Sequence, residues 1–139
     1  MRRRAREAAL SVLFQMDVGK ASLEDALATV RDDWPPDDWT LIETLVRGTR
    51  SHLSEIDALI ARTAEHWTVE RMAAVDRNVL RMALFELLCT STPVGVVINE
   101  AVELAKRYST EESGRFVNGL LGKVVRSGIP PLVGQAAET

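Results

Sequence analysis

The sequence predicts an all-α protein, a compact bundle of about seven helices with no β-sheet. Apolar residues recur at three- and four-residue spacing along most of the chain, and no segment alternates steadily between apolar and polar residues. The composition agrees, because 46% hydrophobic and 27% charged residues are typical of a globular protein. The length of 139 residues allows one domain, or two small subdomains that share one core.

The first half of the chain contains four predicted helices. The first ends near Gly19, and its apolar stripe consists of Ala5, Ala8, Ala9, Val12, Leu13 and Met16. Ser22 is a candidate N-cap for the second helix, and Pro35-Pro36 separates the second from the third. Gly48 and Ser51 suggest a break before the fourth helix. The apolar positions of that helix are Leu53, Ile56, Leu59 and Ile60.

Three further helices are predicted in the second half. Thr68 is a candidate cap for the segment that leads into residues 75–88. Residues 75–88 are apolar on nearly all sides, which places this helix at the centre of the bundle. Pro93 opens the next helix, and the last runs over about residues 112–126. We expect residues 128–139 to form an extended or disordered tail.

Basic residues gather at the N-terminus of a protein that is acidic overall, with a net charge of −3. The chain begins with four arginines: Arg2, Arg3, Arg4 and Arg6. Arginines in the first turn oppose the helix dipole, so they destabilise the helix unless an anion binds. Two interpretations stay open: a nucleic-acid contact, or a solvated end that serves solubility or touches a membrane surface. Residues 24–43 carry seven acids and one base, so we expect them to lie away from bound nucleic acid.

Two other features are candidates for binding. Phe14 shares the outer face of the first helix with Arg3, where its ring could stack on a base or be buried between two halves of the bundle. Asn118 carries an amide that suits a base edge or a backbone contact equally. Near it, Gly119 and Gly122 lie three residues apart, and we expect them to permit close helix packing.

No motif indicates catalysis, a cofactor or a metal. The chain has no glycine-rich phosphate loop, and one cysteine with two histidines is too few for a metal site. Glu111-Glu112 are more simply first-turn acids at a helix start than a catalytic pair. No apolar run is long enough to cross a bilayer, and no signal peptide is evident. The sequence therefore predicts a cytoplasmic protein that is not an enzyme and has no cofactor.

Several stretches resemble the NusB family of bacterial transcription antitermination factors. They are the pattern in residues 6–17, the helix at 75–87, and the motifs at 97–106 and 116–119. The likeness is specific over about residues 2–17 and 75–123, and it depends on helix content and spacing alone over about 20–70. Gly122 departs from the family, which often has a polar residue at this position.

The resemblance implies one all-helical domain over residues 1–127, with an N-terminal subdomain at about 1–66 and a C-terminal one at about 67–127. It also implies binding to boxA-type single-stranded RNA as a heterodimer with NusE, a small-subunit ribosomal protein. That heterodimer acts in the RNA polymerase antitermination complex on ribosomal RNA operons, and some members self-associate, so a homodimer is possible. The RNA-contacting positions that the resemblance implies are Arg2, Arg3, Arg4, Arg6, Phe14, Phe116 and Asn118.

Two other functions are compatible with the same features. A NusB-like domain also forms the N-terminal RNA-binding part of a ribosomal RNA cytosine methyltransferase. That function requires a following catalytic domain with a methyl-donor site and a catalytic cysteine, whereas this chain ends at Thr139. A helical adaptor that binds only protein would use its arginines for solubility.

Overall fold

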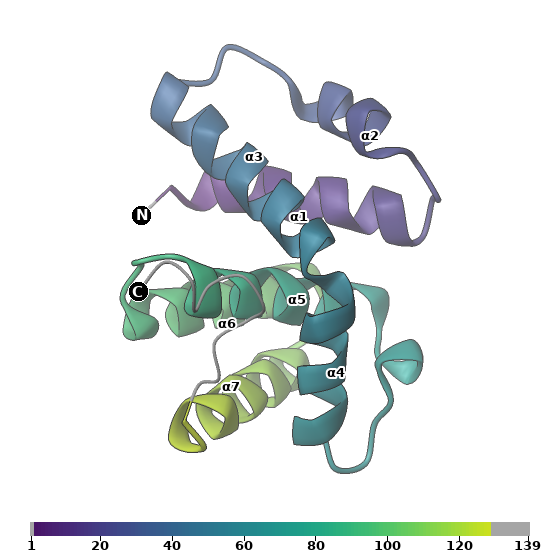
Figure 1. The fold of residues 1–139 in the computed structure, drawn as a ribbon, viewed down its shortest axis with the longest axis vertical. Helices are drawn as coiled ribbons and strands as arrows, with labels where there is room; N and C mark the ends of the chain where they lie inside the picture. The colour runs from purple at the N-terminus through teal and green to yellow at the C-terminus, as the bar shows by residue number, and fades with distance from the viewer. Residues whose placement is uncertain (1, 129–139) are drawn as a thin grey trace.

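The computed structural model describes residues 2–128, and within them the chain is helical with no strand, so the predicted fold class is confirmed (Figure 1). Within these residues no helix is long and apolar enough to cross a membrane. The expected tail lies outside the described residues from position 129 onward. The elements are α1 (Arg3–Asp17), α2 (Leu23–Val30), α3 (Pro36–Ser51), α4 (Leu53–Thr63), a 3₁₀ turn η1 (Val69–Arg71), α5 (Ala74–Cys89), α6 (Val94–Tyr108) and α7 (Glu111–Arg126).

Local chemistry explains where three of the helices begin. The Ser22 hydroxyl caps α2 by accepting a hydrogen bond from the Asp25 backbone N–H at 3.2 Å. The Thr110 hydroxyl caps α7 in the same way, accepting from Ser113 at 3.0 Å. Pro36 starts α3, where its fixed φ suits the first turn. Thr68 makes no such cap, and the segment after it is the short turn η1 rather than the start of α5.

Glycine positions correct two expectations. Gly48 does not break a helix: α3 continues through it to Ser51, and the Phe85 ring of α5 lies directly on the space that a side chain would need. Gly119 is not a packing position either, because no atom lies within 4 Å of where its Cβ would be. At Gly122, the atoms that lie nearest to the position of a Cβ belong to the side chain of Arg126, which is on the same helix. Gly122 therefore does not bring another helix close.

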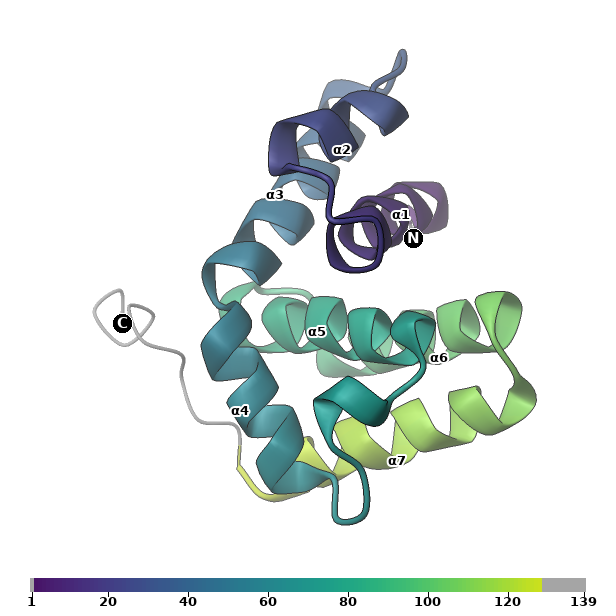
Figure 2. The ribbon, with the colours of Figure 1, turned by 90° about the vertical axis from the view of Figure 1, so that its right-hand side faces the viewer.

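Helices α1–α3 form one group and α4–α7 a second, and α5 lies at the centre of the molecule (Figures 1 and 2). α5 contacts α1 and α3 on one side and α4, α6 and α7 on the other. Its Leu80 and Leu84 are fully buried, as the apolar sequence of this helix predicts. Because α4 packs on α5 and α7, we propose that the two subdomains divide near His52 rather than near residue 66.

Candidate nucleic-acid interface

Three of the four N-terminal arginines reach the surface at the start of α1. Arg2 and Arg4 are exposed, and the Arg3 side chain is 41% exposed. Arg3 donates two hydrogen bonds to the buried Glu100 of α6, from Nε to Oε1 at 3.1 Å and from Nη2 to Oε2 at 2.9 Å. These bonds lower the pKa of the Glu100 carboxyl, which therefore stays ionised. Arg3 is anchored through Glu100, while part of its side chain remains open to solvent.

Arg6 lies in the interior, contrary to its expected role as an RNA contact. It is 5% exposed, and its guanidinium pairs with the equally buried Glu86 of α5, with Nε 3.2 Å from Oε1 and a second bond from Nη2 to Oε2. A buried, paired guanidinium cannot reach a phosphate at the surface. Arg6 therefore holds α1 on α5, and the candidate interface at this end is left with Arg2, Arg3 and Arg4.

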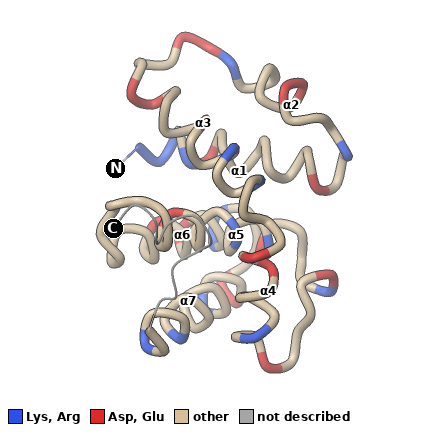
Figure 3. The backbone as a smooth tube through the Cα atoms, viewed as in Figure 1, with Lys and Arg blue, Asp and Glu red and all other residues tan. Residues whose placement is uncertain are grey.

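The acidic segment is not remote from these arginines. Arg2 lies 3.5 Å from a carboxylate oxygen of Asp38 and 4.0 Å from one of Asp37, both in the first turn of α3. The guanidinium of Arg4 lies 5.0 Å from the ring centroid of Trp34, in the turn before α3. Figure 3 shows the basic start of α1 facing the acidic start of α3. Residues 34–38 therefore border the candidate interface, although the sequence places residues 24–43 away from bound nucleic acid.

Phe14 is a surface residue rather than a core residue. It is 36% exposed and lies beside a hollow between α1, α5 and the end of α6, which Leu10, Val75 and Tyr108 also line. Its ring is therefore accessible for stacking, one of the two alternatives that the sequence left open. Leu10, on the same face of α1, is buried.

The α7 candidates form a separate part of the surface. Asn118 is exposed, and Phe116 is half-buried beside a groove formed with the end of α4 and the loop after it. Trp67 of that loop is 53% exposed and lines the same groove. Gly119 also lines it and, lacking a side chain, leaves it open. Sequence periodicity did not identify Trp67 or Tyr108 as exposed aromatic residues. Trp67 lies in a loop and Tyr108 at the end of a helix, and neither position is unusual for an aromatic residue in the sequence.

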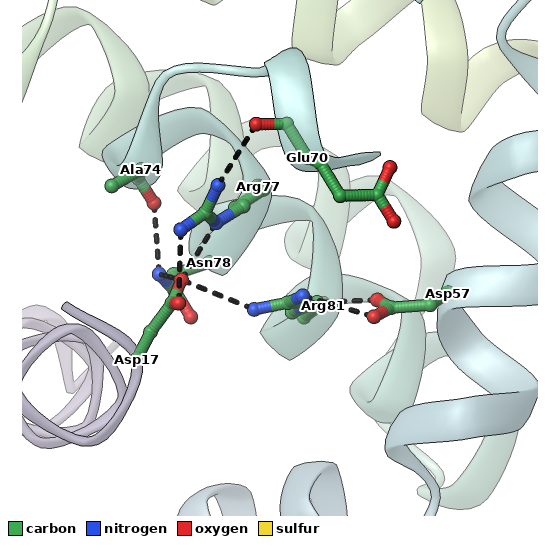
Figure 4. A network of polar contacts seen from close by, with 7 residues as sticks. All are labelled: Asp17, Asp57, Glu70, Ala74, Arg77, Asn78 and Arg81. Atoms are coloured by element: carbon green, nitrogen blue, oxygen red, sulfur yellow. Dashed lines mark hydrogen bonds and ion pairs between the residues drawn. The ribbon is translucent and has the colours of Figure 1, made fainter. Parts of the chain in front are cut away.

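A polar network fixes the other end of α1 (Figure 4). Asp17 accepts hydrogen bonds from Arg77 at 2.6 and 2.9 Å, from Asn78 at 2.9 Å and from Arg81 at 3.2 Å, all on α5. Arg81 also binds Asp57 of α4 at 2.8 and 2.9 Å. Burial alone would raise the pKa of Asp17, but the bonds from Arg77 and Asn78 outweigh it and lower the pKa. The network therefore sets how α1 lies on α4 and α5.

The described residues offer no alternative site based on a metal, since no group of three or more His, Cys, Asp or Glu side chains is placed to hold one. The candidate surface instead consists of exposed arginines at the start of α1, a hollow with aromatic side chains further along α1, and a groove with aromatic side chains beside α7. Guanidinium groups and exposed rings are the groups that bind the phosphates and bases of single-stranded nucleic acid. A family model described as the NusB family matches residues 3–126.

The chain belongs to the NusB family. Transcription antitermination protein NusB from Anaeromyxobacter dehalogenans (strain 2CP-1 / ATCC BAA-258) is 50% identical over 133 residues, which cover 94% of this chain and 93% of that protein. The protein of the same name from Solibacter usitatus (strain Ellin6076) is 50% identical over 129 residues, covering 90% of this chain and 88% of that protein. The resemblance found in the sequence is thus confirmed.

Solved NusB structures share the fold. T. maritima NusB matches with a TM-score of 0.87 and 41% identity, over 94% of each chain. A second match, with a TM-score of 0.77 and 30% identity, covers 91% of this chain and 98% of the other. That structure is described as antitermination factors NusB and NusE in complex with dsRNA.

Proposed function

We propose that this chain is a transcription antitermination factor that binds boxA-type single-stranded RNA together with NusE and supports processive transcription of ribosomal RNA operons. The observation that carries the proposal is the exposed basic end of α1, with Arg2, Arg3 and Arg4, on a NusB-family fold. Phosphate contacts from such arginines hold the RNA, and exposed rings such as Phe14 contact its bases.

RNA binding by the chain alone is weak under this proposal. Three surface arginines neutralise few phosphates, and each contact with single-stranded RNA contributes only about 0.7 to the slope of log K against log salt. Asp37 and Asp38 lie beside Arg2 and further reduce the local positive potential. NusE supplies the remaining contacts, and a structural relative described as antitermination factors NusB and NusE in complex with dsRNA supports a joint role of the two proteins in RNA binding.

The chain performs no chemistry of its own in this role and acts within the RNA polymerase antitermination complex in the cytoplasm. The relatives that match over about nine-tenths of both chains are named antitermination proteins, which supports this function over the RNA-binding part of a methyltransferase. A protein-only adaptor is less well supported, because it leaves the exposed arginines on α1 without a ligand.

A transcription assay tests the function directly. Purified chain and the NusE of the same organism are added to RNA polymerase transcribing a template with boxA upstream of a terminator. We expect read-through to increase on this template and not on one with a scrambled boxA. Equal read-through on both templates, with the chain present or absent, would contradict the proposal.

A further inference from the structure

A polar cavity lies at the C-terminal end of α1, where the two groups of helices meet. Its volume is about 390 Å³, which is within the range of small-molecule sites. Its walls come from α1, α3, α4, α5 and the turn after α1, and they include Asp17, Asn78 and Arg81 of the network in Figure 4. A ligand held there would touch both groups of helices at once.

Two basic side chains at this cavity have no acidic partner. Lys20, in the turn after α1, and Arg50, in the last turn of α3, are both exposed. Neither side chain forms an ion pair or hydrogen bond within residues 2–128. The network beside them is balanced, because its two arginines offset its two carboxylates. Lys20 and Arg50 therefore give the cavity a surplus of positive charge, on a chain whose net charge is −3, and this favours an anionic ligand.

The backbone of Lys20 supports a role for its side chain. Its φ is 57°, in the left-handed region that favours glycine. Gly19 precedes it, yet Gly19 is not in this region. The turn after α1 thus has a lysine at the position where its backbone favours glycine. A strained residue of this kind indicates that the site requires the side chain.

One wall of the cavity carries a buried hydroxyl without a hydrogen-bond partner. Thr49 is 1% exposed and lines the cavity, and its Oγ1 has no partner in the part of the chain that the structure describes. A buried polar atom normally has one, and valine would fill nearly the same space without an unpaired hydroxyl. The Thr49 hydroxyl therefore favours a ligand that brings an oxygen to this wall.

The walls also indicate which kind of anion fits. Leu13, Met16 and Leu53 form an apolar part, which suits carbon atoms beside the anionic group. Among the described residues that line the cavity none is aromatic, so no ring is there to stack on a base. A phosphate group matches the cations, because a guanidinium forms paired hydrogen bonds with it and an ammonium binds it as a point charge. A small phosphate ester therefore fits better than an RNA strand.

We propose that this cavity binds a small phosphate monoester, with Lys20 and Arg50 on the phosphate oxygens and the Thr49 hydroxyl donating a hydrogen bond to a ligand oxygen. The inference goes beyond the proposed function and does not depend on it, since the cavity lies at the opposite end of α1 from the exposed N-terminal arginines. A ligand there would join α1 and α3 to α4 and α5, and so stabilise the folded chain.

The test uses the full chain in calorimetric titrations and thermal melts at low salt. It should bind ribose 5-phosphate, and its melting temperature should rise by about 5 °C at a ligand concentration about tenfold above Kd. Ribose without the phosphate should not bind. Lys20→Ala and Arg50→Ala should each weaken binding roughly tenfold, because each removes a charge-assisted hydrogen bond. Arg62→Ala, which removes an exposed charge of α4 outside the cavity, is the matched control.

Thr49→Val separates binding from folding. It removes the unpartnered hydroxyl, so without ligand the variant should melt at the same temperature as the unchanged chain or higher. It should nevertheless bind the phosphate ester roughly 2- to 10-fold more weakly, because the ligand loses one hydrogen bond. Equal affinity after this change would overturn the proposal, since the ligand would not reach this wall of the cavity.

Melting curves without ligand check that each variant folds. If the unchanged chain does not bind the phosphate ester, or if Arg62→Ala weakens binding as much as Arg50→Ala, the inference is overturned and the proposed function stays intact. RNA titrations with NusE complete the test, because Lys20→Ala and Arg50→Ala should leave RNA affinity unchanged. Weaker RNA binding by these two variants, with no binding of the phosphate ester, would also overturn the inference by showing that the cavity receives the RNA backbone.

Discussion

Arg6 and Glu86 lie 80 residues apart in the sequence and face each other in the interior, with the guanidinium Nε 3.2 Å from the carboxylate Oε1. Both residues are almost fully buried, at 5% and 2% exposure. Their pairing divides the N-terminal arginines into two kinds. Arg6 joins α1 to α5, whereas Arg2, Arg3 and Arg4 are at the surface.

Removing the Arg6 side chain should therefore lower the folding stability of the protein rather than weaken RNA binding selectively. Arg6→Ala leaves the Glu86 carboxylate buried without its partner, which typically costs about 3–5 kcal/mol of folding stability. Thermal or urea melts measure this decrease in stability. The double change Arg6→Met with Glu86→Leu should recover much of it, because it removes both charges and fills the space. Arg6→Ala that melts like the unchanged chain would show that the pair contributes nothing.

Arg2 and Arg4 should behave in the opposite way. Arg2→Ala with Arg4→Ala should leave the melt nearly unchanged and weaken every RNA by a similar factor, because phosphate contacts carry no sequence information. The slope of log K against log salt should fall by about 0.7 for each phosphate that is no longer neutralised. Filter binding at several salt concentrations provides both values. Weaker binding confined to one RNA sequence would show that these side chains contact bases.

The acids beside Arg2 should oppose RNA binding. Asp37→Asn with Asp38→Asn removes two negative charges next to the interface. RNA affinity should rise by up to about fivefold, since exposed ion pairs are worth about 0–1 kcal/mol. The ratio of affinities for boxA-like and scrambled RNA should stay the same. Weaker binding after this change would mean that the carboxylates themselves contact the RNA.

Asp17 should make stability depend on pH in the acid range. Its pKa in the folded protein is lower than the unperturbed value of about 3.9, so its contribution is present above that value and is lost as pH falls through the folded pKa. Asp17→Asn should therefore be less stable than the unchanged chain at pH 7, and the difference should shrink below about pH 4. Urea melts from neutral to strongly acidic pH measure it. A difference that does not change with pH would contradict this role of the charge.

Helical periodicity predicted the fold because each helix buries a stripe that local spacing reveals. It could not predict that Arg6 is buried, because the Arg6 side chain pairs in the interior with Glu86, which is 80 residues away in the sequence. The acid in the middle of the apolar α5 was the available signal, because a buried carboxylate requires a cationic partner. Likewise, Asp37 is close to Arg2 only because α2 and α3 fold back over α1.

The glycines show the same limit. Sequence spacing predicted Gly119 and Gly122 as packing positions, whereas in the structure the Phe85 ring lies against Gly48 and the Lys106 side chain against Gly114. Which glycine faces another helix depends on how helices cross, and that geometry is tertiary. The sequence marked the arginine-rich start and Phe14 as candidate binding residues, but it did not mark Tyr108, because Tyr108 of α6 comes to lie beside Phe14 of α1 only in the fold.

Under the proposed function, this chain recognises boxA-type single-stranded RNA together with NusE. The most direct measurement is a titration of the unchanged chain, with and without NusE, against boxA-like RNA, a scrambled single strand of equal length and a duplex of the same sequence. We predict weak binding by the chain alone, and with NusE a clear preference for the boxA-like single strand over both competitors. Tight binding by the chain alone that is insensitive to salt, or equal affinity for all three RNAs with NusE present, would contradict the proposed function.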